Sequence, residues 1–176
     1  GSVFNANKKN TSSPAGIKFD GKMIISGGKI LCVSTGDGGK GINVDGYLTI
    51  NAGTIDVATT GSKCVYDAEL DLDTSPKGIK ADGEIIINGG LLNIQVTGKS
   101  EGSEGLESKS KITINEGEVI VHAYNDAINL GSDNPIGIEI NGGKIYAISD
   151  NNDGIDSNNK LWINGGLVIA SGASGY

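Results

Sequence analysis

The chain has 176 residues, of which 37% are apolar, 29 are glycine and 3 are proline, and its net charge at pH 7 is −7. This apolar content is low for a compact globule but sufficient for a solenoid, which needs only a thin core between stacked repeats. No apolar run of about 18 residues occurs, so no membrane-spanning helix is expected. Arginine is absent, which argues against nucleic acid as a partner, because phosphate recognition relies heavily on Arg and on basic patches.

The first 15 residues are polar and aperiodic. They predict a flexible arm over 1–15, ahead of a folded domain over 16–176. Gly1-Ser2 is typical of a pair left by cloning, and the sequence contains no signal peptide. A larger parent chain, with a targeting segment or a lipid anchor outside this sequence, therefore stays open.

A unit of strand, Gly-Gly corner and strand recurs six times along the chain. The copies are IISGGKI (24–30), TINAGTI (49–55), IINGGLL (86–92), TINEGEV (113–119), EINGGKI (139–145) and WINGGLV (162–168). Their corner glycines are 25, 37, 27, 26 and 23 residues apart. Self-similarity at such a period predicts a solenoid.

Each copy predicts three short strands. In the first, residues 111–115, alternation turns Ile112 and Ile114 inward. A second strand follows the glycine corner, and a third begins with the pattern Gly-Ile-x-x-Asp, as at 41–45. We therefore expect an all-β fold, a single-stranded parallel β-helix of about six to seven coils. No segment has the sustained 3.6-residue periodicity of a helical solenoid.

One polar position precedes every glycine corner. It is occupied by Ser26, Asn51, Asn88, Asn115, Asn141 and Asn164. Stacked on successive coils, these side chains predict an asparagine ladder in which each amide bonds to the next.

The longest step between corners contains an insertion. Residues 62–77 are expected to leave the helix as a loop that can flank a binding face. Cys32 falls on an inward strand position, and Cys64 replaces a glycine of the repeat. Two small buried thiols are expected, with a disulfide as the alternative.

The third strands change charge along the chain. Residues 1–100 carry no net charge, whereas residues 101–176 carry −7. The position before the first glycine or alanine is occupied by Lys40, Lys77, Glu104, Asp126 and Asp153, and the position three later by Asn43, Lys80, Glu107, Asn129 and Asp156. Because equivalent positions on neighbouring coils lie about 5 Å apart, we expect the acidic residues to form a column.

A column of carboxylates repels itself unless a cation bridges it. Carboxylates and amide carbonyls favour a hard cation, and calcium takes about six to eight such oxygen ligands. The candidate metal ligands are Glu104, Glu107, Asn125, Asp126, Asn129, Asn152, Asp153 and Asp156. The sequence does not favour zinc, whose usual ligands are His and Cys, because His122 is the sole histidine and the cysteines lie elsewhere. The alternative is a solvated acidic edge without metal.

Four further residues are candidates for ligand binding. Trp162 and Tyr146 fall on outward strand positions, where an aromatic ring can stack on a sugar. The alternative for Trp162 is packing beneath a cap or a missing coil. Lys80 and Lys109 are expected near the acidic column.

Four segments carry a family resemblance: KGIKADGEIIINGG (77–90), SEGLESKSKITINEGEVIV (103–121), NDAINLGS (125–132) and NDGIDSNNKLWINGG (152–166). They resemble a bacterial family of secreted or surface-anchored carbohydrate-binding β-helix proteins, and the resemblance covers about residues 16–170. It implies a right-handed parallel β-helix similar to that of pectate lyases, with bound calcium. Glu104, Glu107, Asp126, Asp153 and Asp156 match the acidic motif positions of this family.

The expected function is that of a non-catalytic module of a secreted or cell-surface bacterial protein. It would bind an acidic, pectin-like polysaccharide such as polygalacturonate with the help of structural calcium. One alternative is a calcium-dependent polysaccharide lyase, in which Lys80, Lys109 or Lys111 would act as the base. The absence of Arg counts against a lyase, since substrate carboxylates are usually clamped by one. The other alternative is a surface adhesin or scaffold without a glycan ligand.

Overall fold

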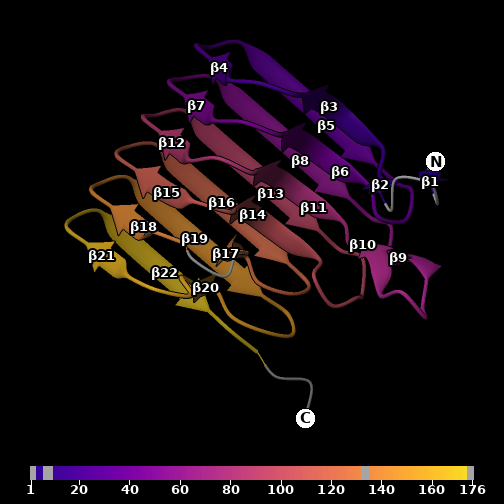
Figure 1. The fold of residues 1–176 in the computed structure, drawn as a ribbon. Helices are drawn as coiled ribbons and strands as arrows, with labels where there is room; N and C mark the ends of the chain where they lie inside the picture. The colour runs from indigo at the N-terminus through magenta and orange to yellow at the C-terminus, as the bar shows by residue number, and fades with distance from the viewer. Residues whose placement is uncertain (1–2, 6–9, 132–134, 174–176) are drawn as a thin grey trace.

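Three parallel sheets of six strands each run the length of the molecule and enclose its core (Figure 1). The computed structural model describes residues 3–5, 10–131 and 135–173. Each turn of the chain contributes one strand to every sheet, and the described residues contain no helix. The prediction of a parallel β-helix of about six to seven coils is confirmed, with six strands in each sheet.

The strands follow the three-strand unit expected from the repeat. The first sheet contains β4 (Met23–Ile25), β7 (Leu48–Ile50), β12 (Ile85–Ile87), β15 (Lys111–Ile114), β18 (Gly137–Ile140) and β21 (Leu161–Ile163). The second contains β5 (Lys29–Ser34), β8 (Thr54–Thr59), β13 (Leu91–Val96), β16 (Glu118–Ala123), β19 (Lys144–Ser149) and β22 (Leu167–Ser171). The third contains β3 (Ala15–Phe19), β6 (Lys40–Val44), β11 (Lys77–Ala81), β14 (Glu104–Ser108), β17 (Ile128–Leu130) and β20 (Ile155–Asp156).

Two antiparallel hairpins lie outside these sheets. β1 (Val3–Asn5) pairs with β2 (Asn10–Ser12), within the segment expected to be a flexible arm. Gly1-Ser2, the expected cloning remnant, lies outside the described residues. The expected insertion forms the second hairpin, in which β9 (Cys64–Asp67) pairs with β10 (Leu72–Thr74).

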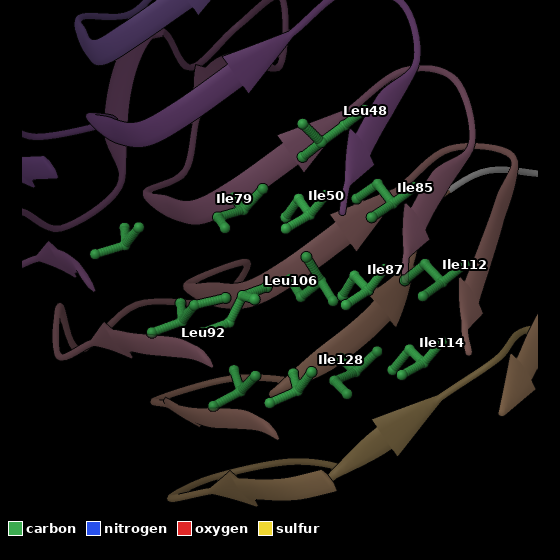
Figure 2. Packing of buried hydrophobic residues seen from close by; sticks show 14 of the residues in the cluster. Leu48, Ile50, Ile79, Ile85, Ile87, Leu92, Leu106, Ile112, Ile114 and Ile128 are labelled. Carbon is green, nitrogen blue, oxygen red and sulfur yellow. The ribbon is translucent and has the colours of Figure 1, made fainter. Parts of the chain in front are cut away.

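The core consists of columns of branched aliphatic side chains (Figure 2). In the first sheet Ile112 pairs with Ile85 and Ile138, and all three side chains are fully buried. Alternation places these residues inward, as the sequence predicted. The last coil differs: Leu161 and Ile163 continue the columns but are 44% and 54% exposed.

The glycine corners and the asparagine ladder form as expected. At the second corner position φ is positive, for example 104° at Gly117, and glycine adopts this conformation without strain. The amide of Asn115 donates to Asn88 Oδ1 at 2.8 Å, and Asn141 donates to Asn115 Oδ1 at 2.9 Å. The same bond links Asn88 to Asn51 and Asn164 to Asn141. The ladder therefore ties five successive coils together along the axis.

The two cysteines are free, and the expected burial holds for one of them. Cys32 faces the core and is 4% exposed. Cys64 is only half-buried, because its segment forms β9 of the hairpin instead of a strand in the third sheet.

Candidate functional site

In β6, β11 and β14 a glycine gives the third sheet two polar positions on its outer face. A Cβ at Gly105 would lie 2.0 Å from Val121 Cγ1, so this position faces the core and has no room for a side chain. Leu106, the next residue, is also buried in the core. Because Gly105 and Leu106 both face inward, Glu104 and Glu107 both lie on the outer face. Strict alternation would place residues three positions apart on opposite faces.

The strand register stacks these outer positions into two columns. Lys77 pairs with Lys40 on one side and Glu104 on the other. In the second column Lys80 pairs with Asn43 and Glu107, and this column continues to Asn129 and Asp156. The face is therefore basic over the early coils and acidic over the late ones.

Lys77 supplies a cation to two of the expected metal ligands. Its Nζ lies 2.5 Å from Glu104 Oε2 and 2.6 Å from Glu107 Oε2. Both carboxylates are almost completely buried. The sequence predicted that a metal ion would offset the Coulomb repulsion between such carboxylates. Here an ammonium group from the preceding coil offsets it.

One positive charge between two acids separates their proton affinities. Burial, reinforced by the neighbouring Glu107, raises the pKa of Glu104 to about 7, against the opposing effect of Lys77. Burial is also the largest single effect on Glu107 and would raise its pKa, but Lys77, the hydrogen bond with Glu104 and the nearby Lys80 together lower the pKa of this carboxyl. Near neutral pH Glu104 is therefore partly protonated, while Glu107 stays charged.

The acidic residues of the last two coils use part of their hydrogen-bonding capacity on the backbone and on one asparagine. Asp126 Oδ1 accepts from the amide of Asp153 at 3.0 Å. Asn158 donates its backbone and side-chain N–H groups to Asp156, and its side chain also reaches Asn129 Oδ1 at 3.3 Å. Burial, with Asp156 and Asp153 adding to it, raises the pKa of Asp126.

The eight expected metal ligands do not form one cluster. Glu104 and Glu107 contact Lys77, whereas Asn125 and Asn152 line a separate cavity. The remaining four, Asp126, Asn129, Asp153 and Asp156, share the acidic end of the third sheet. Within the described ranges, no group of three or more His, Cys, Asp or Glu side chains is arranged to hold a metal ion.

A groove of about 720 Å³ lies over the basic end of the same face. Strands β3, β6 and β11 form its floor, and β10 of the hairpin contributes to its wall through Asp73 and Thr74. Its charged lining consists of five lysines, Lys18, Lys40, Lys77, Lys80 and Lys109, and four aspartates, Asp20, Asp45, Asp73 and Asp82. We call this feature the lysine groove. It contains Lys80 and Lys109, two of the four residues expected to bind a ligand.

Lys40 is the cation in the lysine groove that makes no ion pair with any described residue. Its Nζ donates to Ser13 Oγ at 2.6 Å, Thr74 Oγ1 at 3.0 Å and the carbonyl of Gly38 at 3.2 Å. The residue is 6% exposed. Burial, together with the nearby Lys80 and Lys77, lowers the pKa of Lys40 to about 8. An incoming anion would relieve this unfavourable charge.

The other lysines of the groove are already paired. Lys80 Nζ lies 2.5 Å from Asp82 Oδ1, and Lys109 approaches the same atom at 3.4 Å. Asn43 adds an unused acceptor, since its buried Oδ1 makes no hydrogen bond to the described residues. Sequence reasoning missed Lys40 and Asn43 as site residues because it followed the acidic copies of the repeat. Their signal was present, as they occupy the same two positions as Glu104 and Glu107.

Trp162 and Tyr146 lie away from the lysine groove. Trp162 is 39% exposed on the first sheet of the last coil, where it pairs with Glu139 and has Lys160 Nζ 5.8 Å from its ring centre. Tyr146 lies on the outer face of the second sheet between Ile120 and Ile169, as expected. The structure therefore does not bring the two aromatic residues together with Lys80 and Lys109.

Fold and face together define a class of protein: a parallel β-helix with a polar, grooved outer sheet. The chain matches the family model of the carbohydrate-binding domain-containing proteins over residues 36–127 and again over 64–154, and each match covers just over half of the chain. The chain belongs to this family. The two matches are offset by about one coil, as the internal repeat requires.

No curated protein and no solved structure gives a significant match. No helix in the described part of the chain has the length and hydropathy of a membrane span.

Proposed function

We propose that this carbohydrate-binding chain is a non-catalytic module for acidic polysaccharide, and that the lysine groove binds its carboxylate groups. The observation that carries the proposal is Lys40, an ammonium group that is almost fully buried and has no carboxylate partner among the described residues. A uronate carboxylate would supply the missing charge, and it would accept a charge-assisted hydrogen bond in place of one that Lys40 now donates to Ser13 or Thr74. Such polymers occur outside cells, so the proposal includes a secreted or surface-bound protein.

Binding to polygalacturonate tests the proposal. We expect the wild-type protein to be retarded in polyacrylamide gels that contain polygalacturonate, and Lys40→Met to lose at least tenfold in affinity. Lys144→Met is the matched control, because Lys144 is exposed on the second sheet away from the groove. Equal retardation of Lys40→Met and wild type would place the ligand elsewhere, and no retardation of wild type would exclude the acidic polymer.

The pH dependence adds a second readout of the same site. Only the protonated form of Lys40 attracts a carboxylate, and its pKa in the free protein is about 8. A bound anion raises that value, so affinity should fall as the pH rises above 8, with a midpoint shifted upward by the ligand. Binding that stays constant from pH 7 to about 10 would contradict a role for this lysine.

A polysaccharide lyase is the second candidate, and the same residue favours it. A lysine with a pKa of about 8 is suited to act as a base near neutral pH. In β-elimination the base removes the proton at C5 of a uronate and the C4–O4 bond breaks. A C4=C5 double bond then forms, and the leaving oxygen takes up a proton. Accumulation of the ultraviolet-absorbing unsaturated product, abolished in Lys40→Met, would establish a lyase and overturn the non-catalytic proposal.

Calcium remains part of the proposal, restricted to the acidic end of the third sheet. Glu104 and Glu107 fit a metal ion poorly, since Lys77 lies against both carboxylates. Asp126, Asp153 and Asp156 have no lysine partner among the described ion pairs, and a cation would reduce their mutual repulsion. Thermal unfolding with calcium and with chelator tests this, with Asp126→Asn/Asp156→Asn as the variant. An unchanged midpoint for wild type would exclude a structural calcium ion.

A further inference from the structure

A second cavity, of about 540 Å³, opens where the chain passes from the second sheet to the third. Three successive coils contribute to it through the loops after β13, β16 and β19. The side chains that matter for its chemistry are Lys99, Glu101, Tyr124, Asn125, Asn151 and Asn152. We call this feature the amide cavity. It includes Asn125 and Asn152, which the sequence placed in the metal site.

Backbone hydrogen bonds hold the lining residues in place. The amide of Tyr124 donates to the carbonyl of Val96 at 2.9 Å, and that of Asn125 donates to Ser103 at 2.9 Å. The backbone N–H of Asn152 donates to Ser149 Oγ at 2.8 Å. The first two bonds join one coil to the next and the third holds the loop after β19, all without using the side chains of the lining residues.

Four side-chain polar groups of the cavity are unused, whereas the hydroxyl of Ser100, which also lines it, is hydrogen-bonded to Lys63 and Ser103. Within the described ranges, the amides of Asn125, Asn151 and Asn152 and the hydroxyl of Tyr124 make no hydrogen bond to another residue. An amide offers both donors and acceptors, and a tyrosine hydroxyl offers one donor and an acceptor. Three amides and one phenol in a concave site therefore match a ligand that carries many groups able both to donate and to accept.

The charges of the cavity point to a neutral ligand. Its lining has one lysine, Lys99, and one carboxylate, Glu101, and both are exposed. A single carboxylate is too few for a calcium site, and a single lysine gives no strong field for an anion. Half-buried Tyr124 adds an aromatic surface of the kind against which a sugar ring packs.

We propose that the amide cavity binds a neutral pyranose unit of a polysaccharide. The proposal rests on the carbohydrate-binding function of the chain but not on the acidic ligand of the lysine groove. The two sites adjoin, because Ser75, which lines the lysine groove, donates through its Oγ to the carbonyl of Glu101, which lines the amide cavity, at 3.0 Å. The amide of Lys63 also donates to Ser100 Oγ at 2.9 Å. A neutral unit and an acidic unit would thus bind next to each other, with this contact between them.

Calorimetric titration with cellohexaose, xylohexaose and mannohexaose tests the proposal. We expect wild type to bind at least one of the three, and Tyr124→Ala to bind it at least tenfold more weakly. Asn152→Ala, at an exposed position, provides a second variant with little effect on folding. Tyr47→Ala is the control, since Tyr47 lies between β6 and β7 and does not line the amide cavity.

The outcomes separate the two sites. If the inference is right, Lys40→Met keeps its affinity for the neutral oligosaccharide whatever its affinity for polygalacturonate. Failure of wild type to bind any of the three neutral probes overturns the inference. Binding by both Tyr124→Ala and Asn152→Ala that equals that of wild type overturns it as well. Neither result bears on the binding of acidic polysaccharide, which the polygalacturonate gels test separately.

Discussion

Lys77 connects two buried acids on one coil to the coil before it, and this arrangement makes stability depend on pH. Glu104 has a pKa of about 7 in the folded protein, well above its ordinary value of 4.5. A group whose folded pKa is raised contributes stability at low pH, and that contribution is lost as the pH rises through the window from 4.5 to 7. The lysine limits this loss by stabilising the charged form.

Replacement of this lysine should therefore be most damaging at alkaline pH. We expect Lys77→Met to destabilise the protein by about 3–5 kcal/mol at pH 8, because two carboxylates are left buried without a cation. At pH 5 both acids can take up protons, and most of the loss should be recovered. Urea unfolding at the two pH values measures the difference.

The control for this prediction is a neutral version of the whole cluster. The triple variant Lys77→Met/Glu104→Gln/Glu107→Gln removes all three charges and should approach wild-type stability at both pH values. Destabilisation of Lys77→Met that is equal at pH 5 and pH 8 would mean that lost packing, not charge, accounts for the effect.

For individual residues, the sequence predicted the stacked positions on the strands better than it predicted which side chains form ion pairs. Stacking correctly placed Glu107, Asn129 and Asp156 in one column. It did not predict that Lys77 would reach Glu104 and Glu107, because the strand register brings several polar residues within range of one another. Which of them pair depends on rotamers and burial, and neither is encoded in the repeat.

The hairpin β9–β10 is the element that distinguishes one coil from the others. It contributes Thr74 to the lysine groove, where the hydroxyl accepts a hydrogen bond from Lys40. The insertion was predicted from the longest step between corners, but its strands were not, since Leu72–Thr74 has no clear alternation. Pairing with Cys64–Asp67 decides this structure, and such pairing is visible only in three dimensions.

Removal of the hairpin should separate binding from folding. Deleting Cys64–Thr74 leaves six residues between β8 and β11, close to the seven between β13 and β14. We therefore expect cooperative unfolding to be preserved, since parallel coils tolerate loop variation on their outer side. Affinity for polygalacturonate should fall about fivefold or more as the groove loses its wall. Unchanged affinity in affinity electrophoresis would show that the hairpin does not border the ligand.

Over the whole molecule, the core is closed in the middle and open at the last coil. Ile114 and Ile163 occupy the same inward column of the first sheet, but Ile114 is fully buried whereas Ile163 is 54% exposed. This contrast follows from stacking, because an inward side chain is covered only where a coil lies on both sides.

One matched pair of substitutions measures that contrast. Ile114→Ala should cost about 2–5 kcal/mol, as is typical for a large aliphatic residue cut back in a closed core. Ile163→Ala removes the same atoms and should cost less than about 1 kcal/mol, since much of its surface is already in contact with water. Chemical denaturation of both variants gives the two values, and equal losses would contradict the open end.

The architecture of the whole molecule could be predicted almost entirely from the sequence, and the binding features only in part. Six similar units determine the strands, the corners and the asparagine ladder, since each copy repeats the same physical requirement. The lysine groove and the amide cavity arise where copies differ, as at Lys40 and Tyr124. Their form depends on neighbours one coil away, so no single unit reveals them.

The change from basic to acidic coils along the third sheet gives the solenoid an electric dipole moment along its axis. In the field of a polyanion, this moment exerts a torque that turns the early coils toward the polymer before any contact is made. The field decays over about 8–10 Å at physiological ionic strength, so this alignment acts during the last part of the approach. A polyuronate chain would therefore meet Lys40 and its neighbours first, and added salt should slow association more than it speeds dissociation.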